Sequence, residues 1–141
     1  MTEMEGVLFD AIKLIHPALK IVLDPRVRIE RAYLESSGSG EESGSLVFTF
    51  TLTVSVCRMV DSVKVACHFE YDRGKRPSWV PKKVSISEGQ NKVDLHVLFT
   101  QEGPLLLTRE EISRDLSIPE LLKQFCEGQK IRSKPRMQLH S

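Results

Sequence analysis

The sequence predicts an α+β domain: an antiparallel sheet of four to six strands with an amphipathic N-terminal helix and C-terminal helices. Through the middle of the chain, apolar residues alternate with polar ones at the period of two that a half-buried strand requires. Residues 2–16 instead repeat apolar side chains at helical spacing, and a capping-box pattern follows the last alternating segment. The alternative architecture is a β-sandwich with flanking helices, in which the same strands divide between two sheets.

The length and composition are those of one globular domain, expected over residues 1–128 of the 141. With 40% hydrophobic residues, 28% charged residues and a formal net charge of +1, the chain fits neither a disordered protein nor a polycation built for nucleic acid. No apolar run reaches the roughly eighteen residues of a membrane span, and the N-terminus lacks the basic start of a signal peptide. We therefore expect a soluble protein of the cytoplasm or nucleus, without a membrane partner.

The first helix is expected to begin at Thr2, which forms a capping-box pattern with Glu5. Pro17 predicts that it ends near His16, because proline donates no backbone hydrogen bond and disfavours the α conformation in the residue before it. We expect its apolar stripe to cover one face of the sheet. The stripe consists of Met4, Val7, Leu8, Ala11, Ile12 and Ile15.

An edge strand is expected from Val27 to Tyr33, where charged side chains would keep the strand from pairing with another molecule. The next stretch, residues 35–44 (ESSGSGEESG), has no apolar side chain and predicts a flexible loop at 35–45. Such a composition is typical of a natural loop and of an engineered linker alike.

The strongest strand signal runs from Ser45 to Cys57, SLVFTFTLTVSVC. One face of this strand is apolar and needs a helix to cover it, whereas the other is mostly threonine and serine, which favours a single sheet with helices on one face. After a turn expected at residues 58–62, alternation resumes from Val63 to Tyr71 and predicts an antiparallel hairpin.

Pro77 and Pro81 argue against a central place in the sheet before Lys82. Strands are expected around Val84 and Ile86 and again from Val93 to Phe99. Residues 105–107 form a short apolar run that suits either a last strand or a segment packed beneath the sheet.

The chain is expected to close with two helices and a tail. Thr108 with Glu111 forms a second capping-box pattern, and Ser117 with Pro119 begins a helix that Gly128 ends. Residues 129–141 carry four basic side chains and no acidic one, which predicts a disordered basic tail.

Catalytic and metal-binding patterns are missing from the sequence, so we expect no enzyme, no cofactor and no metal. The four histidines lack the paired spacing of metal ligands, and the three cysteines show neither C-x-x-C nor zinc-finger spacing. Cys67 and His68 are adjacent in sequence, but consecutive strand residues point to opposite faces and cannot act as a nucleophile and its base. His68 and His96 fall at outward positions of two strands, where they would meet if the strands are neighbours.

The most distinctive surface stretch is residues 73–83, where basic side chains surround the single tryptophan, Trp79. A tryptophan between two prolines suits a rigid anchor packed over the sheet or a protein-interface hot spot, and with basic neighbours it also suits base stacking. We expect a non-catalytic protein–protein interaction domain, a subunit of a larger intracellular assembly that binds other protein subunits. The alternative is a nucleic-acid-binding module that uses the 73–83 loop and the basic C-terminal tail. The expected partner-binding residues are Trp79, Arg73, Lys75, Arg76, Lys82 and Lys83.

The order of elements also resembles the RWD domain and the inactive ubiquitin-conjugating-enzyme variants. The residues that carry this resemblance are a first helix over 5–17, the strands up to Tyr71, and the segment Pro77-Ser-Trp-Val-Pro81 that leads into a further strand. The sequence departs from the family where a loop separates Tyr71 from Pro77 and where residues 93–99 form a strand instead of a helix. The resemblance implies a protein-docking module without catalysis.

Overall fold

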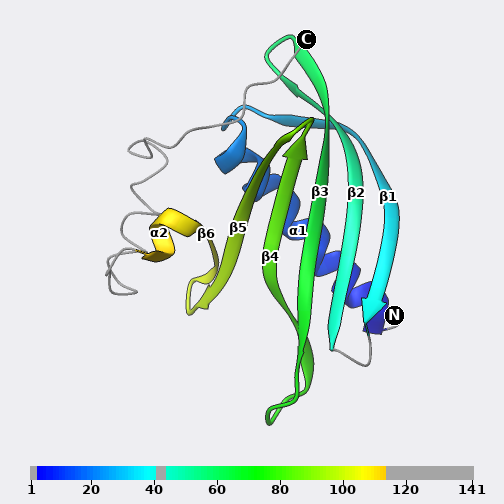
Figure 1. Cartoon of the computed structure of the whole chain (residues 1–141), viewed down its shortest axis with the longest axis vertical. Helices are drawn as coiled ribbons and strands as arrows, with labels where there is room; N and C mark the ends of the chain where they lie inside the picture. Colours follow the sequence, from blue (N-terminus) through cyan, green and yellow to red (C-terminus); the bar gives the residue numbers. More distant parts are fainter. Residues whose placement is uncertain (1–2, 41–43, 114–141) are drawn as a thin grey trace.

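A computed structural model of the chain describes residues 3–40 and 44–113 (Figure 1). A long helix, α1, precedes six strands in the sequential order β1-β2-β3-β4-β5-β6, with every neighbouring pair antiparallel, and a short helix, α2, follows them. This arrangement confirms the predicted α+β class with one antiparallel sheet, and it excludes the sandwich for the described residues. The bounds are α1 Glu3–Val22, β1 Arg28–Gly40, β2 Ser45–Val56, β3 Met59–Asp72, β4 Ser78–Glu88, β5 Asn91–Thr100, β6 Gly103–Thr108 and α2 Arg109–Ser113.

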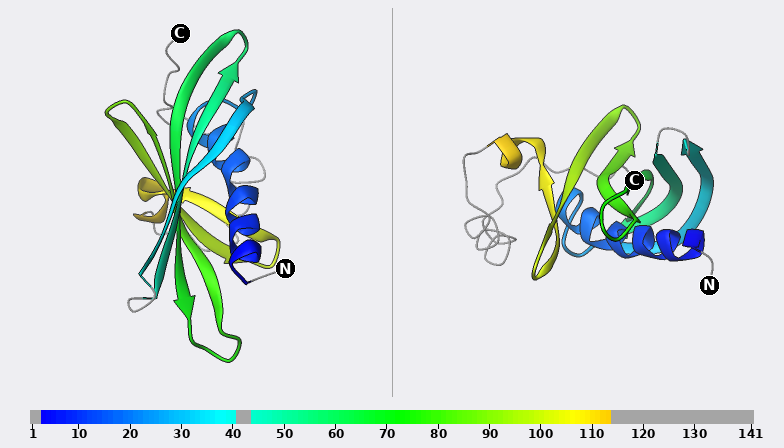
Figure 2. Two further views of the ribbon diagram at one scale, coloured as in Figure 1. Left: turned by 90° about the vertical axis from the view of Figure 1, so that its right-hand side faces the viewer. Right: turned by 90° about the horizontal axis from the view of Figure 1, so that it is seen from below.

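The two helices lie on opposite sides of the sheet (Figure 2). Helix α1 crosses one face of the sheet diagonally: it begins near the end of β1 and runs toward β5 (Figure 1). We call the face that α1 covers the inner face. Helix α2 lies on the other side, next to β5 and β6. The sheet therefore has one face that is covered along a diagonal and one face that is largely open.

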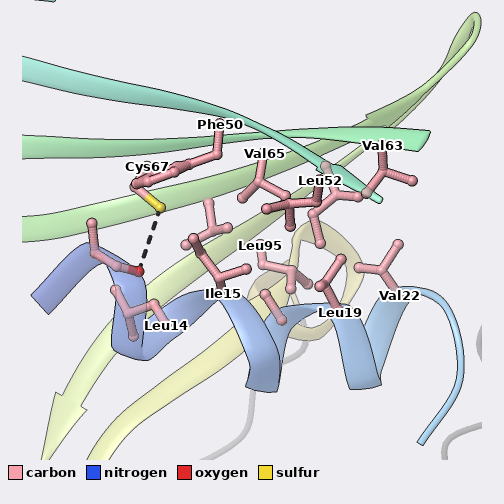
Figure 3. Packing of buried hydrophobic residues seen from close by; sticks show 14 of the residues in the cluster. Leu14, Ile15, Leu19, Val22, Phe50, Leu52, Val63, Val65, Cys67 and Leu95 are labelled. Carbon is pink, nitrogen blue, oxygen red and sulfur yellow. Dashed lines mark hydrogen bonds between the residues drawn. The ribbon is translucent and has the colours of Figure 1, made fainter. Parts of the chain in front are cut away.

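The hydrophobic core lies between α1 and the inner face (Figure 3). Two residues of the predicted stripe, Met4 and Ile12, are exposed instead of covering the sheet. Alternate residues of β2 are buried from Leu46 to Val54, and the paired positions of β3 continue the layer. The Phe48 and Phe69 rings meet edge to face with centroids 6.0 Å apart. Ala11 and Ala18 are fully buried on α1, so the helix backbone comes close enough for the Cys67 Sγ to donate to the Ala11 carbonyl oxygen at 3.8 Å.

The predicted end of the first helix at His16 is wrong, because α1 continues through Pro17 to Val22. A proline inside a helix costs about 3 kcal/mol relative to alanine. Beyond Pro17, however, several large apolar side chains are buried, and each contributes roughly 1.5–3 kcal/mol. Burial on the sheet therefore outweighs the lost hydrogen bond. The buried side chains after Pro17 are Ala18, Leu19, Ile21 and Val22.

The predicted flexible loop at 35–45 is also corrected. Residues 35–40 form the end of β1 and pair with β2 as far as Gly40 opposite Ser45. An edge strand can be polar, because main-chain groups form the hydrogen bonds that pair it with its neighbour and its other edge faces solvent. Residues 41–43 lie outside the described part of the chain.

Two further corrections concern the strand ends. Only residues 57 and 58 separate β2 from β3, where Cys57 adopts a φ of 57°, so the expected turn over 58–62 is shorter than predicted. Strand β4 begins at Ser78, before Pro81, and not at Lys82. Pro81 is tolerated because it lies at a register shift opposite Phe69, and because β5 pairs with β4 only from Lys83 onward.

The C-terminal part confirms one capping box. Residues 105–107 belong to β6, and then the Thr108 backbone N–H donates to Glu111 Oε1 at 2.9 Å while the Glu111 N–H donates to Thr108 Oγ1 at 3.4 Å. This reciprocal pair fixes where α2 starts. The helix expected at 117–128, the basic tail 129–141 and the Thr2 cap all lie outside the described residues.

Candidate interaction site

A groove of about 470 Å³ lies between α1 and the inner face of β4, β5 and β6. Its walls are largely apolar, with Leu14 on the helix side and Trp79, Pro81, Phe99 and Pro104 on the sheet side. The groove exists because α1 crosses the sheet diagonally and leaves the ends of these strands uncovered (Figure 1). The charged residues at its helix side are Asp10 and Lys13.

Trp79 is held in this groove by its strand neighbour. It pairs with Tyr71 of β3, and the two ring centroids are 5.2 Å apart at an interplanar angle of 59°. Trp79 is half-buried and packs against the edge of the core. The indole therefore contacts Tyr71 and the edge of the core, and it also lines the groove.

Phe99 is an exposed apolar residue of the groove, with 53% of its surface accessible. It lies near the end of β5 and pairs with Pro104 at the start of β6, so the short β5–β6 hairpin presents both side chains on the inner face. An exposed phenylalanine beside a half-buried tryptophan and two prolines is a rigid apolar surface of the kind that protein interfaces use.

The predicted basic residues divide between two places. Arg73, Lys75 and Arg76 are exposed in the loop between β3 and β4, whose bend is supported by the Gly74 N–H donating to Asp72 Oδ1 at 3.0 Å. This hairpin projects beyond the rest of the sheet and leans toward the side of α1 (Figures 1 and 2), and Trp79 follows its loop, three residues after Arg76. Lys82 is exposed next to the register shift in β4.

Lys83 does not belong with the others. It pairs with His68 of β3 and His96 of β5, which places it on the open outer face, opposite to the side of Trp79. The structure thus separates Lys83 from the tryptophan, and none of the predicted cations lines the groove. The sequence analysis missed Phe99 and Pro104 as groove residues. Phe99 falls at an inward position of the alternating pattern in β5, and Pro104 has no such signal. The alternation cannot show which strand ends α1 leaves uncovered.

Within the described part of the chain, the histidines and cysteines that the sequence analysis considered lie apart from the groove. His68 and His96 share the outer face, as expected from their phase, but β4 lies between their strands and Lys83 stands between them. Burial raises the pKa of the Cys67 thiol to about 12, and Cys67 packs under α1. Cys57 and Cys67 are both free thiols. Within residues 3–40 and 44–113, no three His, Cys, Asp or Glu side chains are grouped to hold a metal ion.

Comparison with protein-family models, characterised proteins and solved structures gave no match. The resemblance to the RWD domain therefore stays a prediction. The two described helices also include no stretch long and apolar enough to cross a membrane.

Proposed function

We propose that the protein is a non-catalytic interaction domain, a subunit of a larger intracellular assembly. In this proposal the groove beside Trp79 receives an apolar side chain from an acidic segment of another protein subunit. The single observation that carries the proposal is the juxtaposition of Phe99, 53% exposed, with Trp79 in one groove.

The apolar part of the groove would supply affinity. Fully burying a phenylalanine side chain gains roughly 1.5–3 kcal/mol, so covering the exposed half of Phe99 gains about 1 kcal/mol. A partner side chain that enters the groove adds its own buried surface and contacts the indole face as well. Because Tyr71 and the prolines already restrict Trp79, little side-chain entropy is lost on binding.

The charges favour an acidic partner. The β3–β4 loop carries Arg73, Lys75 and Arg76 against one carboxylate, Asp72, which itself accepts the Gly74 N–H. Exposed cations at the rim of an apolar site raise the association rate of an acidic segment and select its orientation, and this effect weakens as salt rises. A partner with acidic residues next to an apolar anchor therefore fits both parts of the site.

Selection of short peptides from a displayed random library against the whole chain tests this proposal. We expect an enriched consensus with one large apolar residue flanked by Asp or Glu. A labelled consensus peptide should lose about tenfold or more in affinity with Phe99→Ser, because the exposed ring can be removed with little cost in stability. Trp79→Ala should also weaken binding while leaving thermal stability nearly intact.

Tyr33→Ser is the matched control, since Tyr33 is a comparably exposed aromatic (58%) on β1, at the other edge of the sheet. Equal binding by Phe99→Ser and the parent chain would overturn the proposal. So would a consensus without acidic residues whose binding is insensitive to salt. If Trp79→Ala prevents folding, Trp79 is a core residue. The Phe99→Ser result alone then decides whether the groove binds the peptide.

Nucleic acid is the competing ligand for the same loop cations. An electrophoretic titration with a single-stranded oligonucleotide separates the two, because phosphate contacts are strongest at low salt. We expect no binding of the oligonucleotide at about 50 mM salt. Oligonucleotide binding that is lost with Arg73→Gln and Arg76→Gln would replace the protein partner with a nucleic acid.

A further inference from the structure

A second pocket, of about 530 Å³, lies on the opposite side of the sheet, between the outer face of β4 and β5 and the start of α2. Its lining includes Lys83 of β4 and His96 of β5, which pair with each other, whereas His68 of β3 pairs with Lys83 on the far side and does not line the pocket. All three side chains are half-buried. This pocket shares no lining residue with the groove beside Trp79.

The strand side of the pocket is formed by Lys83 of β4 and by Lys92, Asp94 and His96 of β5, which share the outer face. The wall is the first turn of α2, which is held in place by the capping box of Thr108 and Glu111. The site is thus built on paired strands and a capped turn rather than on a mobile loop.

Three cations and two carboxylates line this pocket, which leaves a net positive charge. Lys83, Lys92 and Arg109 form no ion pair with any residue in the described part of the chain. Asp94 accepts from the Ser85 hydroxyl at 2.7 Å, which leaves its negative charge in place, and Glu110 has an interaction of its own. The excess of cations over carboxylates at this pocket favours an anionic ligand over a neutral or cationic one.

We propose that this outer pocket binds a small molecule that carries a phosphate group. Lysine provides a compact positive charge and arginine a planar fork of donors, and both are the usual partners of phosphate oxygens. His96 adds a ring nitrogen at the same site. The volume lies within the range of roughly 300–1,000 Å³ typical of small-molecule sites, so an organic body fits beside the phosphate.

Calorimetric titration of the whole chain with inorganic phosphate and with phenyl phosphate tests the proposal, with acetate as the singly charged comparison. We expect phosphate to bind, phenyl phosphate to bind more tightly because of its organic body, and acetate to bind at least about tenfold more weakly. Lys83→Gln should weaken phenyl phosphate binding by about tenfold or more, the effect of removing one charged donor.

Lys82→Gln is the matched control, because Lys82 is the preceding residue of the same strand and does not line the pocket. It should leave phosphate affinity within about twofold. Arg109→Gln, an exposed position on α2, provides a second test should Lys83→Gln fail to fold. Equal weakening by Lys82→Gln and Lys83→Gln would show non-specific screening and overturn the proposal, as would acetate binding as tightly as phosphate. Phe99→Ser should not change phosphate binding, so this result is independent of the proposed function.

Discussion

Replacing Pro17 by alanine should stabilise the protein, which is the opposite of the usual effect of changing a residue in a buried helix. Pro17 lies inside α1 but is exposed, and the residues after it are buried against the sheet. In the present structure the buried surface beyond Pro17 outweighs the cost of the proline. Alanine at this position keeps the burial and restores the backbone donor.

The expected magnitude follows from two opposing effects. Proline in a helix interior is about 3 kcal/mol less favourable than alanine. Against this, alanine gives the unfolded chain more conformational freedom, which costs about 0.4–1 kcal/mol of stability. The free energy of unfolding should therefore rise by about 2 kcal/mol, or several degrees in Tm.

Urea denaturation followed by circular dichroism at 222 nm measures this change. Leu19→Ala is the companion variant, because Leu19 is fully buried beyond Pro17, and its truncation should cost about 2–5 kcal/mol. A Pro17→Ala protein that is less stable than the parent would refute the reasoning. That result would mean that the shape which proline gives to α1 is needed for the packing of Leu19 and its neighbours.

Two further predictions concern single side chains. In a chain carrying Cys126→Ser, a thiol reagent should label exposed Cys57 quickly and Cys67 only at the rate of unfolding. Cys67 reacts slowly because burial raises the pKa of its thiol to about 12. Rapid labelling of both thiols in the folded protein would contradict this prediction. Burial, with Lys83 and Lys92 nearby, lowers the pKa of His68 below its usual 6.5, although Asp94 opposes the shift. The folded state then binds fewer protons than the unfolded state, so stability is fully present above pH 6.5 and is lost as the pH falls through the folded pKa. His68→Gln should flatten the stability profile below that pH in urea titrations, and an unchanged profile would show that His68 is not responsible.

The sequence was sufficient for the sheet because its signal is local. Alternation in residues 45–57 and 63–71 marks strands whichever neighbours they have, and the capping box of Thr108 and Glu111 needs only four consecutive residues. The errors lie where a distant partner decides the structure. Burial under the sheet carries α1 past Pro17, and pairing with β2 orders residues 35–40 despite their composition.

The two sites show the same difference between local sequence signals and contacts with distant residues. Trp79 stands out in the sequence as a single aromatic residue between prolines, whereas Phe99 joins it only because of where α1 crosses the sheet. In the outer pocket, Lys83 and His96 are more than ten residues apart, and they meet because the register of β4 and β5 aligns them. The separation of these residues in the sequence does not predict that they meet until the strand pairing is known.

The central claim, that the groove beside Trp79 docks a partner segment, can be tested through the single tryptophan of the chain. Its indole is half-buried at the groove, so its emission reports directly on occupancy. We predict that adding the selected acidic peptide shifts the emission to shorter wavelength and lowers quenching by acrylamide, and that Phe99→Ser reduces both changes. Peptide binding that leaves the emission and the quenching of Trp79 unchanged would place the partner elsewhere and contradict the claim.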